Sequence, residues 1–216
     1  MKKVLHNQRF EIDKQYKRTG LIKTGDIFFR QGNEVFWGLP FSKLVAKATN
    51  SKYSHASIAL VDDCDGEIYL IEVALDGTVK YRLIDWLDFC GEPYFEVWRF
   101  KESDKVRNDI ALAIEKFLDV DGDYNLNFVT TPNRYYCTES IVSIYKDAGL
   151  PQLCEGNLVK DIIPLWKYYT IFLPINFLAK KLLNASMPTK EKLICVGNKN
   201  LGLMSSEYLY KVCEYG

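Results

Sequence analysis

The feature that most constrains the fold is a hairpin signal between residues 67 and 83. Two apolar, strand-like runs, "EIYLIEVA" and "GTVKYRL", are joined at Asp76-Gly77, a dipeptide typical of a tight hairpin turn. Strands joined this closely run antiparallel. Three further runs read as strands because they are short, apolar and bounded by turn residues: 25–30, 53–61 and 94–100. An antiparallel sheet is therefore predicted before residue 100.

Three helices are predicted around this sheet. Apolar residues recur at helical spacing in 41–50 and again in 103–120, where Ser103 is the expected N-cap. A third helix is expected to begin at or just after Cys137 and to end before Gly149, because glycine favours the position that follows a helix. Strands grouped in this way with helices beside them indicate the α+β class.

Composition limits the class of protein and its compartment. The chain has 216 residues, with 28 Lys+Arg and 28 Asp+Glu, so its net charge is zero. A nucleic-acid-binding protein normally carries a basic surplus, so no nucleic-acid partner is expected. The first 20 residues contain basic side chains without an apolar run behind them, so no signal peptide is predicted and a cytoplasmic location is expected.

We predict one domain, 1–216, with a core at about 20–150 and an extension, 151–216, packed on it. The extension reads as irregular and partly helical, with a last short helix near "SSEYLYKV". Its most apolar stretch, from Ile162 to Leu183, contains two prolines and is not a continuous membrane span. It either adds to the core or lines, around 166–177, a groove beside Cys137 that accepts an apolar substrate group.

Cysteine usage excludes the commonest metal site. The six cysteines are scattered, no CxxC pair occurs, and there are only two histidines, so neither zinc nor another cofactor is expected. Without a signal peptide, reduced thiols are expected. A free cysteine is usually buried packing material. Cys137 differs because a helix N-terminus favours a thiolate, which is the nucleophilic form of the side chain.

Two further residues have both a structural and a catalytic interpretation. His55 lies in the strand pattern "YSHASIALV", either as a hydrogen-bonded structural histidine or as the base beside a thiol. Glu72 lies within the apolar run "EIYLIEVA", either at the surface of an edge strand or buried as the carboxylate that orients an imidazole. Together with Cys137, these residues supply a nucleophile, a base and an orienting group.

Four segments, taken in order, resemble a known family. "GDIFFR", "SKYSHASIAL", "YLIEVA…GTVKY" and "DGDYNLNFVTTPNRYYCTESIVSIYKDAGL" are similar to the NlpC-type papain-like cysteine hydrolases, more narrowly to their circularly permuted YiiX/YebB-like branch. In the ordinary order the cysteine helix comes first, whereas here it follows the histidine strand. The resemblance implies a permuted papain-like fold, with an antiparallel sheet or partial barrel packed against helices and the nucleophile at a helix N-terminus.

The resemblance also implies site residues and a reaction. Cys137, His55 and Glu72 are expected to be catalytic, and an oxyanion or substrate-binding role is expected for Tyr53, Tyr136 and Thr138. A thiol hydrolase would cleave an amide, thioester or ester bond in a small peptide-like or lipid-like acyl substrate, and peripheral contact with a membrane fits such a substrate. Two alternatives stay open: an acyltransferase of the lecithin:retinol acyltransferase type, and a catalytically idle module that binds a lipid or peptide.

Overall fold

A computed structural model describes most of the chain, namely residues 2–32, 41–49, 51–74, 77–89, 94–120, 124–125, 134–163, 165–183, 189–198 and 200–215. Its centre is a six-stranded sheet in the order β4-β3-β2-β1-β5-β8, in which every neighbouring pair is antiparallel. The strands are β1 (Ile27–Arg30), β2 (His55–Val61), β3 (Ile68–Ala74), β4 (Gly77–Arg82), β5 (Phe95–Phe100) and β8 (Leu209–Tyr215). The predicted α+β class and antiparallel sheet are confirmed.

The predicted hairpin is the β3–β4 pair. Gly77 has φ 102°, a value that side chains rarely allow, which explains why glycine stands at this turn. The register pairs Ile71 with Lys80 and Glu72 with Val79. Because β3 lies between β2 and β4, both of its edges are paired, and its side chains are inside the sheet rather than at its margin.

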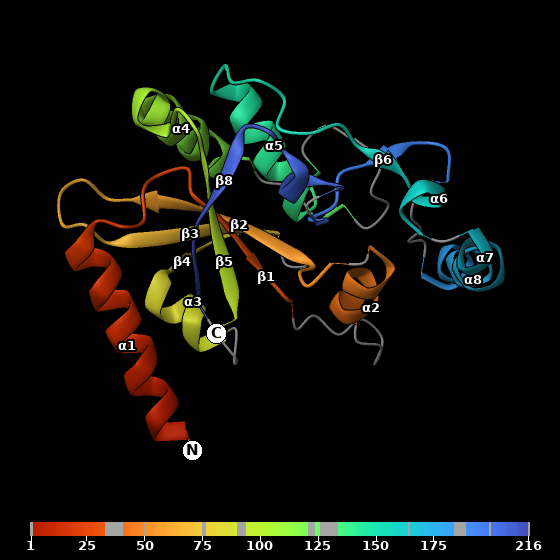
Figure 1. The fold of residues 1–216 in the computed structure, drawn as a ribbon, viewed down its shortest axis with the longest axis horizontal. Helices are drawn as coiled ribbons and strands as arrows, with labels where there is room; N and C mark the ends of the chain where they lie inside the picture. The colour runs from red at the N-terminus through yellow and green to blue at the C-terminus, as the bar shows by residue number, and fades with distance from the viewer. Residues whose placement is uncertain are drawn as a thin grey trace.

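Helices cover both faces of the sheet (Figure 1). On one face lie α4 (Ser103–Leu118) and α5 (Cys137–Asp147), and on the other lie α1 (Lys2–Thr19) and α3 (Leu83–Phe89). Each face has its own buried apolar cluster, as the alternation of strand side chains requires.

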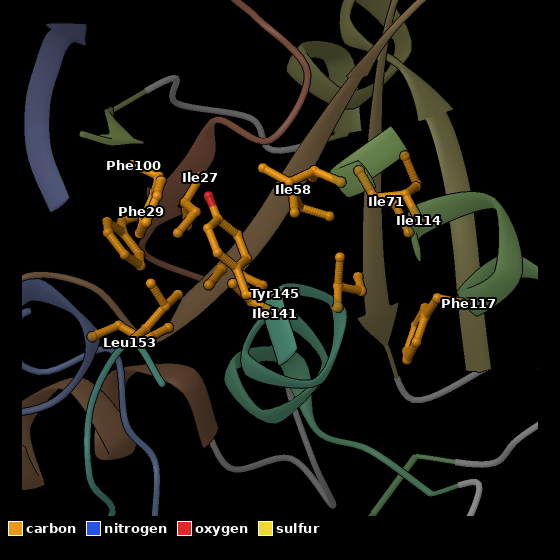
Figure 2. Packing of buried hydrophobic residues seen from close by; sticks show 14 of the residues in the cluster. Ile27, Phe29, Ile58, Ile71, Phe100, Ile114, Phe117, Ile141, Tyr145 and Leu153 are labelled. Atoms are coloured by element: carbon orange, nitrogen blue, oxygen red, sulfur yellow. The ribbon is translucent and has the colours of Figure 1, made fainter. Parts of the chain in front are cut away.

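The cluster on the α5 face positions that helix. Figure 2 shows Ile141 and Tyr145 of α5 packed towards Ile27, Phe29 and Ile58 of the sheet. The Tyr145 hydroxyl also donates a 2.6 Å hydrogen bond to the carbonyl of Gly25, just before β1. Apolar packing and this buried hydrogen bond therefore set the angle at which the start of α5 meets the sheet.

The two ends of the chain form elements that the sequence did not indicate. The polar N-terminal segment forms α1, and Ile12 and Tyr16 are buried against the α3 face of the sheet. The helix expected near "SSEYLYKV" is wrong, because this segment leads into β8, which pairs with β5 and begins at the buried Leu209. Without β8, the backbone groups along that edge of β5 would lack sheet partners.

The expected N-cap of α4 is wrong. Ser103 is the first residue of α4 rather than its N-cap, a position that Glu102 occupies without a side-chain capping bond. The predicted helix at 41–50 is confirmed as α2 (Phe41–Ala48), and α3 begins at Leu83, the residue at which a strand was expected to end. Gly149 has φ 75° and follows α5 as predicted.

The apolar part of the extension forms a small separate unit. It contains β6 (Asn157–Leu158), α6 (Val159–Ile162), α7 (Leu165–Lys167), the π-helical η1 (Tyr168–Phe172), α8 (Leu173–Leu183) and β7 (Lys192–Leu193), and η2 (Leu203–Ser205) follows it. Its cluster is built around Val159, Ile163, Tyr168, Leu193 and Cys195. In Figure 1, α7 and α8 lie apart from the sheet, whereas Leu153, Val196 and Leu203 of the extension belong to the buried cluster on the α5 face. Both interpretations of the apolar stretch, as added core or as a groove wall, stay predictions. Among the described residues, no helix combines the length and apolarity needed to cross a bilayer.

Candidate active site

His55 and Glu72 meet inside the sheet. His55 opens β2, and its Nε2 atom lies 3.0 Å from Oε2 of Glu72 on β3. Glu72 is only 2% exposed on a strand with two neighbours, so its interpretation as a surface residue of an edge strand is wrong. A carboxylate at such a position must be compensated by hydrogen bonds or charge.

Four side chains supply that compensation to Glu72. Its Oε2 atom accepts hydrogen bonds from the Ser57 hydroxyl at 2.7 Å, from Trp86 Nε1 at 3.1 Å and from the His55 ring. Its Oε1 atom lies 3.4 Å from Nη2 of the buried Arg30. Burial alone would raise the pKa of the Glu72 carboxyl, but the charge of His55, together with its hydrogen bond and Arg30, holds this pKa well below its usual range.

His55 is the titrating group of the site. Burial alone would lower the pKa of its ring, and the charge of Glu72 opposes this effect. Arg30 lowers the pKa again, whereas Cys137 raises it through charge and a hydrogen bond. The net result is a pKa of about 10, so the ring is an imidazolium at neutral pH.

Cys137 reaches this imidazole from the start of α5. It is the first residue of the helix, it is buried, and its thiol is the second side-chain partner of the His55 ring. Since Glu72 occupies Nε2, the nitrogen left for the thiol is Nδ1. The preceding Tyr136 is extended, with φ −108° and ψ 166°, so the N–H groups of the first turn have no partner within the helix.

The residues on either side of Cys137 hold one residue of the extension. The Ile194 N–H donates to the Tyr136 hydroxyl at 2.9 Å, and the Thr138 hydroxyl donates to the Ile194 carbonyl at 2.7 Å. We refer to these two bonds as the Ile194 clamp. Ser140 adds a 2.8 Å bond to the carbonyl of Cys137. The side chains of Tyr136 and Thr138 therefore have a structural use, and their oxyanion or substrate-binding roles stay predictions.

Tyr53 is buried next to β5. Its ring stacks on that of Tyr94, with 6.0 Å between the centroids. Burial, together with Tyr94 and Glu96, raises the pKa of its hydroxyl far above the ordinary value. These contacts place the hydroxyl beside a carboxylate of the neighbouring strand, and its assignment as an oxyanion donor stays a prediction.

Three residues around Glu72 were not identified from the sequence as part of the site. Ser57 carried the best available signal, because it lies two residues after His55 and therefore on the same face of β2. Arg30 follows a buried apolar run, and the register places it opposite His55. Trp86 belongs to a helix that the sequence pattern did not indicate.

The matching family model describes permuted papain-like amidases of the YaeF/YiiX type, the C92 family. It aligns with residues 22–183, which is most of the chain and includes Cys137, His55 and Glu72. The chain belongs to this family. It is therefore a papain-like cysteine hydrolase of the amidase type. The match ends before Ile194, so the clamp joins the neighbours of Cys137 to a segment outside the family region.

One solved structure confirms the fold. The YiiX protein of Escherichia coli O157:H7, described as a metalloprotein, superposes with a TM-score of 0.69 at 19% identity, covering 89% of this chain and 97% of that one. Comparison with curated proteins gives no match. In the part of this chain that the structure describes, no three His, Cys, Asp or Glu side chains gather within reach of one metal ion.

Proposed function

We propose that the chain hydrolyses the amide bond of a small peptide-like or lipid-like acyl substrate through Cys137, His55 and Glu72. One observation carries the proposal: the imidazole of His55 lies between a thiol at a helix start and a buried, ionised carboxylate. This is the order of nucleophile, base and orienting group that thiol hydrolysis requires. Membership of an amidase family favours the amide over ester and thioester bonds.

In this mechanism the resting site holds a thiolate beside an imidazolium. The sulfur of Cys137 attacks the carbonyl carbon, and the backbone N–H of Cys137 at the start of α5 donates to the oxyanion that forms. His55 then gives its proton to the leaving amine, the C–N bond breaks, and a thioester to Cys137 remains. A water molecule loses a proton to His55 and attacks the thioester, which releases the carboxylic acid and regenerates the thiolate beside the imidazolium.

Glu72 acts on the imidazole throughout this cycle. Its bond to Nε2 keeps Nδ1 directed at the sulfur and stabilises the positive charge of the ring. The bonds from Ser57 and Trp86 occupy the same oxygen and restrict rotation of the carboxylate. Because Glu72 is ionised and buried, it remains an acceptor over the whole neutral pH range.

The test is a panel of fluorogenic amides that carry short acyl, long-chain acyl, amino-acyl or dipeptidyl groups. We expect turnover of at least one class by the native protein and none by Cys137→Ala. The matched control is Cys64→Ala, because Cys64 is an exposed free cysteine on the turn between β2 and β3 and its loss should not change the rate. Turnover that survives in Cys137→Ala would overturn the proposal.

The same assay separates hydrolysis from acyl transfer. Product is measured with and without an added acceptor, such as glycerol or a primary amine. A hydrolase releases free acid without an acceptor, whereas a transferase forms product only when one is present. If a thioester on Cys137 accumulates until an acceptor is added, the protein is an acyltransferase rather than a hydrolase. If Cys137 resists alkylation and the protein is inactive, the result favours a binding module.

A further inference from the structure

Three large aromatic side chains of the extension face solvent. Trp166 and Tyr169 are each 63% exposed and Phe177 is 71% exposed. They lie within 19 consecutive residues that form α7, η1 and α8. Elsewhere among the described residues, the exposed large apolar side chains are Tyr94 at 37%, Leu112 at 65% and Tyr210 at 43%, which lie far apart in the sequence. We call Trp166, Tyr169 and Phe177 the aromatic face.

The aromatic face belongs to a packed helix. Tyr168 of the same helical segment is buried with Val159, Ile163 and Leu193, so the inner side of the segment already has its apolar partner. The three rings lie on the solvent side of the segment, since they are exposed whereas Tyr168 belongs to the buried cluster. In Figure 1, α7 and α8 lie at one end of the molecule, away from the sheet.

The charged residues in the segment that carries the aromatic face are mostly positive. Residues 159–183 contain four lysines (160, 167, 180 and 181) and one acidic residue, Asp161, although the whole chain has zero net charge. Lys160, Lys180 and Lys181 are exposed, and Lys167 lies with Nζ 5.4 Å from the centre of the Trp166 ring. Positive charge and aromatic rings therefore occupy the same protruding helix.

We propose that α7, η1 and α8 dock on the surface of a bilayer that contains anionic phospholipid. Tryptophan and tyrosine favour the boundary between lipid headgroups and acyl chains, and lysine beside them is attracted to anionic headgroups. None of the described helices is able to span a bilayer, so the helix lies in the plane of the interface. Pairing with a second copy is less favourable, because it would bring the same lysines together.

This inference does not depend on the proposed function. Binding to lipid is measured without a substrate, and the residues involved lie outside the group formed by Cys137, His55 and Glu72. Failure of vesicle binding leaves the hydrolase intact, and failure of the hydrolase leaves vesicle binding intact. If both hold, the enzyme works beside a membrane, where a lipid-like substrate would be concentrated.

The experiment is co-sedimentation of the full chain with vesicles of phosphatidylcholine, with or without phosphatidylserine. We expect binding to the phosphatidylserine vesicles that weakens as salt is added. Lys180→Gln with Lys181→Gln should weaken it by roughly fivefold per lysine, the usual contribution of one basic residue at an anionic surface. The matched control is Lys105→Gln with Lys116→Gln, which removes two exposed lysines of α4 and should leave binding unchanged.

The aromatic face is tested in the same way. Trp166→Ser, Tyr169→Ser and Phe177→Ser together should reduce binding more than tenfold, whereas Leu112→Ser, at a 65% exposed position of α4, should have no effect. The single variant Phe177→Ser is included in case the triple variant fails to fold, and it should show a smaller loss in the same direction. Transfer of Trp166 to the interface is followed by its fluorescence, with Trp166→Phe as the reference for the other tryptophans.

Four results would overturn the proposal. The first is equal sedimentation with and without phosphatidylserine. The second is an equal loss of binding in the α4 control variants. The third is a concentration-dependent dimer that Phe177→Ser dissociates while vesicles are not bound, which would make the aromatic face an interface between copies of this chain. Capture of an acidic protein without vesicle binding would also exclude the lipid surface as the occupant.

Discussion

The two halves of the candidate site are held in place by different means. His55 and Glu72 lie on neighbouring strands, and side chains from β1, β2 and α3 surround the carboxylate. Cys137 lies at a helix start, and the residues next to it are bound to the backbone of Ile194. The strand half is complete within residues 30–86, whereas the helix half uses a residue more than fifty positions further along the chain.

The two halves therefore differ in how many hydrogen bonds keep their side chains in place. The strand half has a buried carboxylate that four donors share, so loss of one donor leaves others in place. The helix half depends on two bonds to one residue, which lies beyond the region that the family model matches. We infer that the extension of this chain is part of the support of its nucleophile.

Glu72→Gln is expected to have the largest effect among the supporting residues. It keeps the shape of the side chain but removes the charge that stabilises the imidazolium, so kcat should fall by about 10²–10⁴ while the protein remains folded. His55→Ala should remove nearly all activity, and the double variant should be no worse than His55→Ala alone. The control is Glu96→Gln, a second buried glutamate of the sheet. Unchanged turnover in Glu72→Gln would make another residue the orienting group, with Glu139 as the next candidate.

Breaking the Ile194 clamp should have a smaller effect. Thr138→Val removes the donor to the Ile194 carbonyl, and kcat should fall by about tenfold, with KM nearly unchanged, because sulfur placement is affected rather than substrate affinity. Thr138→Ser restores the hydroxyl and should recover most of the rate. Each lost bond should also lower the free energy of unfolding by about 1 kcal/mol. Lower stability with an unchanged kcat would show that the clamp does not position the nucleophile.

The ion pair formed by His55 and Glu72 should also make the free energy of unfolding depend on pH. The pKa of His55 is raised from 6.5 to about 10, so its stabilising contribution is complete below pH 6.5 and is lost as pH rises through about 10. The pKa of Glu72 is lowered from 4.5, so its contribution is present above pH 4.5 and declines in more acidic solution. Both contributions are therefore complete between pH 4.5 and 6.5.

Urea unfolding of the native protein and of Glu72→Gln measures this directly. The difference in unfolding free energy between the two should be larger at about pH 5.5 than at about pH 9.5, because the imidazolium begins to lose its proton at the higher value. Comparing the two proteins cancels most contributions from groups that they share. A difference that does not change with pH would mean that the pair is not an ion pair in the folded protein.

Arg30→Gln is expected to give the smallest change and tests the strand half alone. Arg30 lowers the pKa of His55, so its removal should move the alkaline limb of the kcat/KM profile to higher pH. Arg30 is a positioning residue here, because it acts on Glu72 and on the charge of His55 rather than on substrate. A lower melting temperature with an unmoved profile would indicate a purely structural role.

The sequence predicted the strand half more fully than the helix half. Strand-like apolar runs and the turn at Gly77 are local sequence signals. Strands β2 and β3 and their polar residues His55 and Glu72 could therefore be predicted. The Ile194 clamp could not be predicted from the sequence, because it uses the backbone atoms of Ile194, which every residue type carries. Strand β8 was missed for a related reason: its partner β5 lies more than a hundred residues earlier, and no local pattern reports such a pairing.

The helices were likewise predictable only where a local sequence signal marks them. Helix α5 was predictable because Gly149 marks its end and its apolar residues face the sheet. Trp86 was not recognised, because α3 is short and its contact with Glu72 depends on how the helix packs on the sheet. Residues 164 and 184–188, like the segments at 33–40 and 126–133, lie outside the part of the chain that the structure describes.

The most direct test of the central claim is limited labelling of the native protein with iodoacetamide near pH 6, followed by peptide mass spectrometry. Burial raises the pKa of Cys154 to about 11 and that of Cys195 to about 12, so both should stay unlabelled. The account predicts that Cys137 is alkylated first and that His55→Ala slows this reaction, because the imidazolium stabilises the thiolate. Preferential labelling of Cys64 or Cys90, with Cys137 inert and His55→Ala without effect, would contradict it.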